Sequence, residues 1–362
     1  MHWELSDEQK LYAESLREWL AARVDSDQLR TWLDAGNYRT FDDALNEDGW
    51  AGVGFDEGVG GQGGGLLEMT LTSRELGRAA APSARWLARA VADAALMREP
   101  QLAQAALEHS ELTILAVRCD RIPSTTAALP LSNGQVSGQV PCVLAADEGD
   151  RFVVPVAMPQ GGTGLAVVER DGGGVHVHPR ALLDRSRSAS DVVFEAAPAR
   201  LIELDDDTDV LLAALTARAA VLVAADALGA AERMLHMTVD YAKQRKQFGR
   251  PIGAFQAVKH AAAQMLVTVE SSYSVALFAA ASVQDASPDS ALHAAAAKAQ
   301  VSRHCAELAD SALTVHGAIG YTWEYDLQLF YKRAKLDRIL FGPPEAWNER
   351  IAGQLPLVLA AS

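Results

Sequence analysis

The sequence YAKQRKQFGRPIGAFQAVKHAAAQM, which occupies residues Tyr241–Met265, links two long Ala-rich segments through a basic corner rich in Gly. The corner contains the cations Lys243, Arg245, Lys246 and Arg250. We expect one helix to end here and a second helix to begin. Cations favour a helix C-terminus, and the free amides of the next N-terminus attract anions, so the corner is a candidate anion site. A solvated basic helix end in an ordinary helical hairpin is the alternative.

The composition bounds the size and the partners of the protein. Its 362 residues are enough for two or three folding units, and 49% apolar and 22% charged residues are ordinary for a globular chain. The formal net charge is −15. Because such an acidic protein repels nucleic acid and anionic membrane surfaces, we expect neither as a partner. An anionic ligand would need the local positive charge of the corner.

The sequence predicts neither a disulfide framework nor a metal site. The three cysteines, Cys119, Cys142 and Cys305, are far apart and form no CxxC motif. His176 and His178 alternate along one expected strand without a third ligand nearby, so exposed strand histidines explain them better than a metal pair. The N-terminal residues lack a secretion-signal pattern and no apolar run requires a bilayer, so we expect a cytoplasmic protein.

Three segments with different periodicity are expected to form three domains. Residues 1–110 show helical spacing, residues 111–203 contain short β-rich runs between turns, and residues 204–362 contain long helices. The prediction is an α+β multidomain fold: an N-terminal helical domain, a middle antiparallel β-barrel or sandwich, and a C-terminal long four-helix bundle. Gly342-Pro343-Pro344 is expected to stop the last helix. The broad apolar faces of the long helices favour burial against other subunits.

A literal GxGxxG motif occurs at Gly58, Gly60 and Gly63. In dinucleotide-binding proteins this motif follows a strand and opens a helix within a βαβ unit. Here no apolar strand leads into the motif and no βαβ pattern surrounds it. We therefore interpret it as a glycine loop before a helix that begins at Leu66.

The domain order and three motifs resemble the acyl-CoA dehydrogenase family, and the resemblance covers the whole chain. The long motif at the corner matches at Tyr241, Ala242, Arg245, Phe248, Gly249, Ile252 and Gln256. Two further motifs support it. The first, within residues 49–77, consists of the elements GW-x-G, GG-x-G and ELG, and the second is a segment over residues 316–325. That segment resembles H-G-G-x-G-Y-x-x-E-Y except at Ala318.

The resemblance implies FAD as the cofactor and an acyl-CoA as the substrate. In family members the Arg and Gln of the long motif reach across a subunit interface to FAD that is bound mainly by the neighbour. Arg245 and Gln256 are thereby implied to contact the FAD phosphates or ribityl chain, with Phe248 near the adenine side. His316 and Gly317 would lie against the FAD of a partner. The alternatives are that Arg245 only caps its helix and that His316 is a packed loop histidine.

The positions that resemble the family's catalytic base hold no carboxylate. The family removes the α-proton of an acyl thioester with a Glu while the β-hydride passes to flavin. This Glu follows the C-terminal helix in a segment resembling A-K-x-x-x-I-Y-E-G-T, and here the base position holds Phe341. A minority of members take the base from the start of the long helix, near Ala219 in this chain. We therefore predict no catalytic residue in this chain.

Other departures also fall on the active site. Asp226 and Glu232 lie further along the same helix, and Glu345 follows Pro343-Pro344, so none is a good substitute base. The β segment lacks the family's T-E-P-x-x-G-S-D run and a later Trp, and Gly342-Pro343 replaces the Gly-Thr after the base. The motif that serves a neighbour's FAD is kept.

The chain thus looks most like the base-lacking subunit of a bacterial heterotetrameric (α2β2) acyl-CoA dehydrogenase. In this interpretation it completes the FAD site of a catalytic partner chain, which dehydrogenates an acyl-CoA that carries a steroid side chain or a fatty acyl group. Two alternatives stay open: a self-sufficient homo-oligomeric flavin enzyme with an unrecognised base, and a scaffold subunit that binds no flavin.

Overall fold

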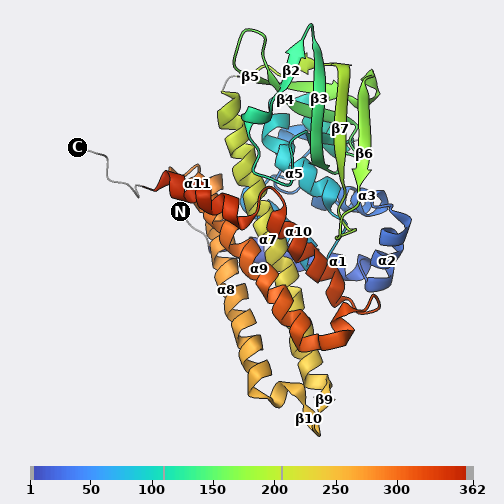
Figure 1. Ribbon diagram of the computed structural model, residues 1–362, viewed down its shortest axis with the longest axis vertical. Coiled ribbons are helices and arrows are strands. Elements are labelled where there is room, and N and C mark those ends of the chain that lie inside the picture. Colours follow the sequence, from blue (N-terminus) through green and yellow to red (C-terminus); the bar gives the residue numbers. More distant parts are fainter. Residues whose placement is uncertain (1–3, 109–110, 205–206, 356–362) are drawn as a thin grey trace, which may run out of the picture. The chain divides into compact units, whose positions relative to one another are not determined.

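The computed structural model describes residues 4–108, 111–204 and 207–355, and Figure 1 labels its elements. Within these residues the chain groups into two compact units. The helical unit comprises the chain up to Asp34, Thr70–Ala81 and the residues from Ala220 onward. The sheet unit comprises Ala35–Met69 and Pro82–Ala219. The domain boundaries near residues 110 and 203 stay predictions.

The helical unit is built from long helices, and its core is their shared apolar surface. It contains most or all of α1 (Asp7–Arg23), α2 (Ser26–Ala35), α4 (Leu66–Arg78), α7 (Thr208–Gln244), α8 (Gln256–Gln284), α9 (Ser290–His316), α10 (Leu327–Ile339) and α11 (Pro344–Gln354), whereas the first turns of α4 and α7 belong to the sheet unit. α9 packs against α8, α10 and α11. We did not expect α11, because we interpreted the double proline as a stop. Pro344 instead opens a new helix, where its missing N–H costs nothing.

α7 and α8 are each long and apolar enough to cross a bilayer by length and composition alone. In α7, 72% of the most apolar window is buried inside the protein, as in the core helix of a globular fold. In α8 the corresponding share is 44%, so much of its apolar surface faces outward.

α4 and α7 approach each other closely because each has a glycine at the contact. A Cβ atom added to Gly229 of α7 would lie 1.8 Å from the carbonyl oxygen of Arg74. One added to Gly77 of α4 would lie 2.2 Å from the carbonyl oxygen of Asp226. Only a residue without a Cβ fits at such a distance. Gly77 is the glycine of the ELG element, whose role here is therefore helix packing.

Buried ion pairs lie beside this contact. Asp226 accepts hydrogen bonds from Arg333 at 3.1 and 3.2 Å, and both side chains are fully buried. Glu232 binds Arg74 at 2.7 Å and Arg78 at 2.9 Å. Each buried charge thus has a partner of opposite sign, which a low-dielectric interior requires.

The sheet unit contains a mixed sheet with the strand order β6-β7-β3-β2-β4-β5-β8, and β1 also pairs with β4. The strands are β1 (Thr113–Leu115), β2 (Leu129–Ser132), β3 (Gln135–Leu144), β4 (Arg151–Ala157), β5 (Thr163–Glu169), β6 (Val175–Arg180), β7 (Ala189–Pro198) and β8 (Arg200–Leu201). β4 runs parallel to both β1 and β2, whereas the other pairings in this sheet are antiparallel. The sheet is therefore mixed. Our expectation of a purely antiparallel sheet was wrong in this respect.

The register of the β2–β3 hairpin is fixed by its two-residue turn. Asn133 and Gly134 both have positive φ, at 52° and 71°, as a type I′ turn requires. Leu131 pairs with Val136 across the hairpin, and both side chains are buried. The turn thus places the apolar residues of both strands on the same face.

The GxGxxG motif forms a tight loop before α4. The described residues that precede it contain no strand, and η2 (Glu57–Val59) is a single 3₁₀ turn. A Cβ added to Gly61 would lie 2.3 Å from the carbonyl oxygen of Phe55. Close backbone packing accounts for glycine at this position.

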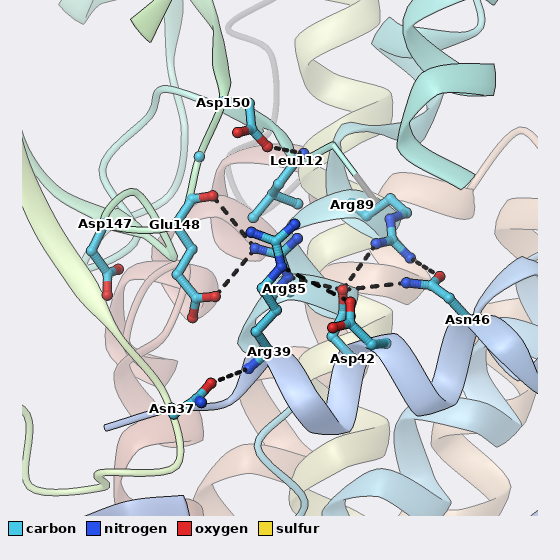
Figure 2. A network of polar contacts seen from close by, with 12 residues as sticks. Asn37, Arg39, Asp42, Asn46, Arg85, Arg89, Leu112, Asp147, Glu148 and Asp150 are labelled. Atoms are coloured by element: carbon cyan, nitrogen blue, oxygen red, sulfur yellow. Dashed lines mark hydrogen bonds and ion pairs between the residues drawn. The ribbon is translucent and has the colours of Figure 1, made fainter. Parts of the chain in front are cut away.

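A buried network of charges ties α3 (Arg39–Glu47) and α5 (Ala84–Leu96) to the turn between β3 and β4 in the sheet unit (Figure 2). Asp42 accepts from Arg85 at 2.8 Å and from Arg89 at 3.3 Å. Arg85 also reaches the carboxylate of Glu148 at 3.2 Å, and Arg89 donates to Asn46 at 3.0 Å. Burial lowers the pKa of Arg89 and raises that of Glu148. Asp42 is therefore the shared counter-ion of two buried guanidinium groups.

Gly229→Ala is expected to lower the free energy of unfolding by about 1–3 kcal/mol or more, because the added methyl group forces the backbones of α4 and α7 apart. Urea unfolding followed by circular dichroism measures this. Gly353→Ala in α11 is the matched control, since nothing lies within 4 Å of a Cβ added there. An unchanged stability of Gly229→Ala would contradict the close contact.

Asp42→Ala is expected to cost about 3–5 kcal/mol, because it removes the counter-ion of the buried Arg89 guanidinium and leaves Arg85 with Glu148 alone. The neighbouring substitution Asp43→Ala is the control. Asp43 makes an exposed ion pair with Arg39 at 4.0 Å, which is worth about 0–1 kcal/mol. If the two variants unfold at the same urea concentration, the network does not stabilise the sheet unit.

Candidate functional site

The corner at Tyr241–Met265 connects the end of α7 to the start of α8 through a short hairpin (Figure 1). Its strands are β9 (Lys246–Gln247) and β10 (Arg250–Pro251), which pair in antiparallel register. Phe248 and Gly249 form the turn with positive φ values of 53° and 78°. The amide of Ile252 closes the corner by donating to the carbonyl of Arg245 at 2.8 Å. Sequence reasoning located the corner but did not predict the hairpin.

The side chains of the corner form an exposed cationic and aromatic surface. Arg245, Lys246 and Arg250 are exposed, and Phe248 is 91% exposed. Phe248 meets Phe255 edge to face with ring centroids 6.1 Å apart, and the Arg250 guanidinium lies 4.2 Å from the Phe255 centroid. No hydrogen bond or ion pair joins the Arg245 side chain to the part of the chain that the structure describes. A guanidinium held at the surface in this way is available to a ligand from outside.

Gln256 is exposed in the first turn of α8. The N-cap residue before it, Phe255, makes no side-chain hydrogen bond to the helix, so the first amides of α8 are not capped by a side chain. A helix N-terminus of this kind adds partial positive charge to the same surface as Arg245.

His316 at the end of α9 is packed against the last turns of α7. Its ring stacks on Tyr241 with centroids 4.6 Å apart and an interplanar angle of 24°. Its Nδ1 lies 2.8 Å from the carbonyl oxygen of Ala312, which only accepts, so Nδ1 carries the proton and Nε2 accepts from the Tyr325 hydroxyl at 3.1 Å. Burial lowers the pKa of His316, which favours this neutral ring. Gly317, with φ of 65°, then ends the helix.

The structure thus brings the two predicted motifs together in the helical unit. Tyr241 of the long motif touches His316, and Arg245 lies one turn further along the chain. His316 itself is buried, as expected for a packed histidine, whereas Arg245 and Gln256 face outward. The candidate ligand contacts at the surface are therefore those of the corner.

Phe341 lies between α10 and α11, where the backbone carbonyls of Phe341 and Gly342 both accept side-chain hydrogen bonds. Its side chain is 3% exposed and its φ is 55°. The indole of Trp347 donates to its carbonyl oxygen at 3.1 Å, and Lys298 donates to the next carbonyl, that of Gly342, at 3.1 Å. The position therefore offers a buried benzyl group and no proton acceptor.

Lys298 is a structural residue that sequence reasoning missed. It is fully buried on α9 and donates to the carbonyls of Asp337 at 2.9 Å and Arg338 at 3.3 Å, which α10 leaves unpaired at its C-terminus. Burial lowers its pKa to about 7. The available signal was a lone Lys within the alanine run AAAAKAQ, on a helix face that is otherwise apolar.

The carboxylates that could replace the missing base are occupied by arginines. Glu345 is exposed and pairs with Arg338 at 2.7 Å and with Arg303 at 3.6 Å. Asp226 and Glu232 belong to the buried ion pairs beside the α4–α7 contact. Ala219 is buried, and its neighbour Arg218 pairs with Asp93 at 2.9 Å within the sheet unit. None of these groups is poised to abstract a proton from a ligand.

Comparison with known proteins places these features in a family. Residues 6–104 match "Acyl-CoA dehydrogenase, N-terminal domain" and residues 209–355 match "Acyl-CoA dehydrogenase, C-terminal domain". The chain is 31% identical over 329 residues to "Acyl-CoA dehydrogenase IpdE2" of Mycobacterium tuberculosis, and the aligned region covers 88% of each sequence. The chain belongs to the acyl-CoA dehydrogenase family. A protein of the same name from Mycolicibacterium smegmatis is 37% identical over 178 residues, which span 49% of this chain and 52% of that relative.

Solved structures confirm the acyl-CoA dehydrogenase fold, with helices at both ends and a sheet between them. The ChsE4-ChsE5 complex from Mycobacterium tuberculosis contains a chain with a TM-score of 0.84 and 22% identity, covering 99% of this chain and 100% of that one. The Tcur3481-Tcur3483 steroid ACAD contains one with a TM-score of 0.84 and 24% identity, covering 96% and 97%.

Acyl-CoA dehydrogenases generally bind FAD, and the corner suits that cofactor. FAD carries a pyrophosphate and an adenine ring, and it supplies the hydride acceptor when bound. The outward-facing guanidinium of Arg245 and the uncapped start of α8 match a phosphate group. The exposed Phe248 ring offers an aromatic face to the adenine ring of FAD. Because these groups point away from their own unit, they fit a cofactor that is presented from outside.

Lys298 makes the stability of the protein depend on pH. In the unfolded chain this amine keeps its proton up to about pH 10.5, whereas in the folded protein it loses the proton near pH 7. The unfolded state therefore binds more protons between these values, so the free energy of unfolding rises with pH, by at most about 1.4 kcal/mol per unit from this group. In Lys298→Met this contribution is absent.

Chemical unfolding of both proteins at pH 7, 8.5 and 9.5 measures the effect. The stability of the wild type relative to Lys298→Met is expected to increase steadily with pH. Lys259→Met is the control, because Lys259 is exposed on α8. A difference between wild type and Lys298→Met that is the same at each pH would contradict the depressed pKa.

Proposed function

We propose that this chain is the non-catalytic subunit of a hetero-oligomeric acyl-CoA dehydrogenase, in which it completes the FAD site of a catalytic partner chain. The partner would carry out the α,β-dehydrogenation of an acyl-CoA. One observation carries the proposal: the outward-facing corner with Arg245 coexists with Phe341 at the family's base position.

The absence of a catalytic base at the expected position supports a non-catalytic role for this chain. Abstraction of a weakly acidic thioester α-proton needs a positioned carboxylate or an equivalent base. Phe341 has no such group, and Glu345, the nearest carboxylate in sequence after it, is held by Arg338 and Arg303. A partner chain that keeps the family's Glu would supply this step.

The corner supports a contribution to a cofactor site that another chain provides. Arg245 would grip two oxygens of the FAD pyrophosphate with its planar guanidinium, and Gln256 would add one donor and one acceptor. Phe248 would lie against the adenine side. The stack of the half-buried Tyr241 on the buried His316 fixes the end of α7 from which Arg245 projects.

The surface of α8 supports an extensive subunit interface. Leu266 is 50% exposed, Val267 59% and Phe278 36%. Exposed large apolar side chains along one helix are typical of protein–protein interfaces.

Related folds occur in the ChsE4-ChsE5 complex and in the Tcur3481-Tcur3483 steroid ACAD. We therefore propose a second acyl-CoA dehydrogenase chain as the partner, and a steroid or fatty acyl-CoA as the substrate of the complex.

Expression of the chain alone and together with a catalytic acyl-CoA dehydrogenase chain encoded beside it tests the proposal. The lone chain is expected to bind little flavin, as read from absorbance near 450 nm, and to show no dye-linked oxidation of an acyl-CoA. The copurified complex is expected to be yellow and active. A stoichiometrically flavinylated, active preparation of the lone chain would instead support a self-sufficient enzyme.

Arg245→Gln in the copurified complex is expected to weaken FAD binding by about 10- to 150-fold, because a charge-assisted hydrogen bond contributes about 1.5–3 kcal/mol. Loss of FAD on dilution, followed by flavin fluorescence, measures the affinity. The control is Lys243→Gln, which removes one exposed charge from the same end of α7. Equal FAD retention by both variants and the wild-type complex would rule out the pyrophosphate contact.

A further inference from the structure

The sheet unit brings together two cysteines that are 23 residues apart in the sequence. The Sγ atoms of Cys119 and Cys142 lie 3.6 Å apart, and both thiols are free and buried. Cys119 follows β1, and Cys142 lies in β3. The sequence predicts no disulfide framework and does not reveal this contact, because spacing along a chain does not show which segments pair.

The backbone holds the two residues in register. The amide of Cys119 donates to the carbonyl of Cys142 at 2.8 Å. An S–S bond is about 2.05 Å long, so the two sulfur atoms must approach by about 1.5 Å to form one.

The local backbone distinguishes Cys142 from an ordinary strand residue. It lies at an irregularity in the β3–β7 register between Val140 and Val143, and its φ is 55°. Its amide donates to the Asp191 carboxylate at 2.8 Å. This side-chain anchor holds the bulge in place and keeps the Cys142 thiol directed at Cys119.

The two thiols are chemically unequal. A hydrogen bond from Cys119 lowers the pKa of Cys142, while the same contact and burial raise the pKa of Cys119. A thiolate assisted by a neighbouring thiol is the reactive form in disulfide exchange. Cys305, in the helical unit, has its pKa raised to about 12 by burial and provides an unreactive internal reference.

A cavity of about 260 Å³ borders the residues next to both thiols. Arg118 and Arg121 line it on the Cys119 side, and Pro141 lines it on the Cys142 side. Asp120 pairs with Arg118 at 2.7 Å and with Arg121 at 3.8 Å, so one carboxylate is shared between two guanidinium groups. The excess positive charge favours an anionic oxidant such as glutathione disulfide at this wall.

We propose that Cys119 and Cys142 are a redox-active dithiol that a small disulfide oxidises to an intramolecular disulfide. The Cys142 thiolate attacks one sulfur of glutathione disulfide, and one glutathione leaves as its thiolate. Cys119 then loses its proton and attacks the Cys142 sulfur of the mixed disulfide, which releases the second glutathione. The protein loses two electrons and two protons, and one glutathione disulfide becomes two glutathione molecules. The new bond links the segment after β1 to β3 across the cavity wall.

The test uses the full chain, reduced, desalted and then incubated with glutathione disulfide. Acid precipitation stops the exchange and removes glutathione disulfide, thiols are counted with Ellman's reagent in denaturant at pH 8, and the protein is digested with trypsin without reduction. The count is expected to fall from three to one. The peptide Cys119–Arg121 is expected to be linked to Ile122–Arg151, with a mass two hydrogen atoms below the sum of the separate peptides.

Variants separate the pair from the third cysteine. Cys305→Ala is expected to give the same linked peptides, whereas Cys119→Ala and Cys142→Ala are expected to give none. Three free thiols after incubation, a glutathione adduct without a cross-link, or a link to Cys305 would each overturn the proposal. Because the peptide map of the wild-type chain decides the outcome, the test does not depend on whether the alanine variants fold.

Discussion

The helical unit depends on the close contact between α4 and α7, which is possible only because Gly77 and Gly229 have no side chains. Backbones that approach this closely bring Arg74 and Arg78 within reach of Glu232. They also confine Asp226 to a dry environment in which the Arg333 guanidinium is its counter-ion. Interiors pack densely and tolerate little change in volume, so these contacts fix the position of α7. Every candidate functional residue of the corner is positioned from the end of that helix.

The corner concentrates positive charge in a protein whose net charge is −15. Arg245 is not used to stabilise the fold: its side chain makes no hydrogen bond or ion pair to the described residues, and Phe248 is almost fully exposed. An exposed aromatic ring and an unused guanidinium on a rigid hairpin are better explained by a ligand or partner than by folding. The Tyr241–His316 contact provides the rigidity, since it anchors the last turns of α7.

The segment around Phe341 is held in place by hydrogen bonds but carries no acid–base group at that position. Lys298 and Trp347 hold its carbonyls, and Glu345 is tied to arginines at the surface. A substitution from carboxylate to benzyl at a buried position removes a group that is costly to bury and leaves the hydrogen bonds of the backbone intact. A stable fold without a carboxylate at this position is what the proposed subunit role requires.

The sequence by itself determined the order of helices, strands and helices, the corner, and the glycine loop before the helix that begins at Leu66, because periodicity, Gly and Pro act locally. It also located Arg245, Gln256 and Phe341 through motifs that are contiguous in the chain. Only the tertiary structure decided that Pro344 opens α11, that β4 is parallel to β1 and β2, and that Lys298 caps α10. It also decided that Cys119 meets Cys142. The physical reason is that these features depend on packing and hydrogen bonding between segments distant in the chain, which local sequence does not encode.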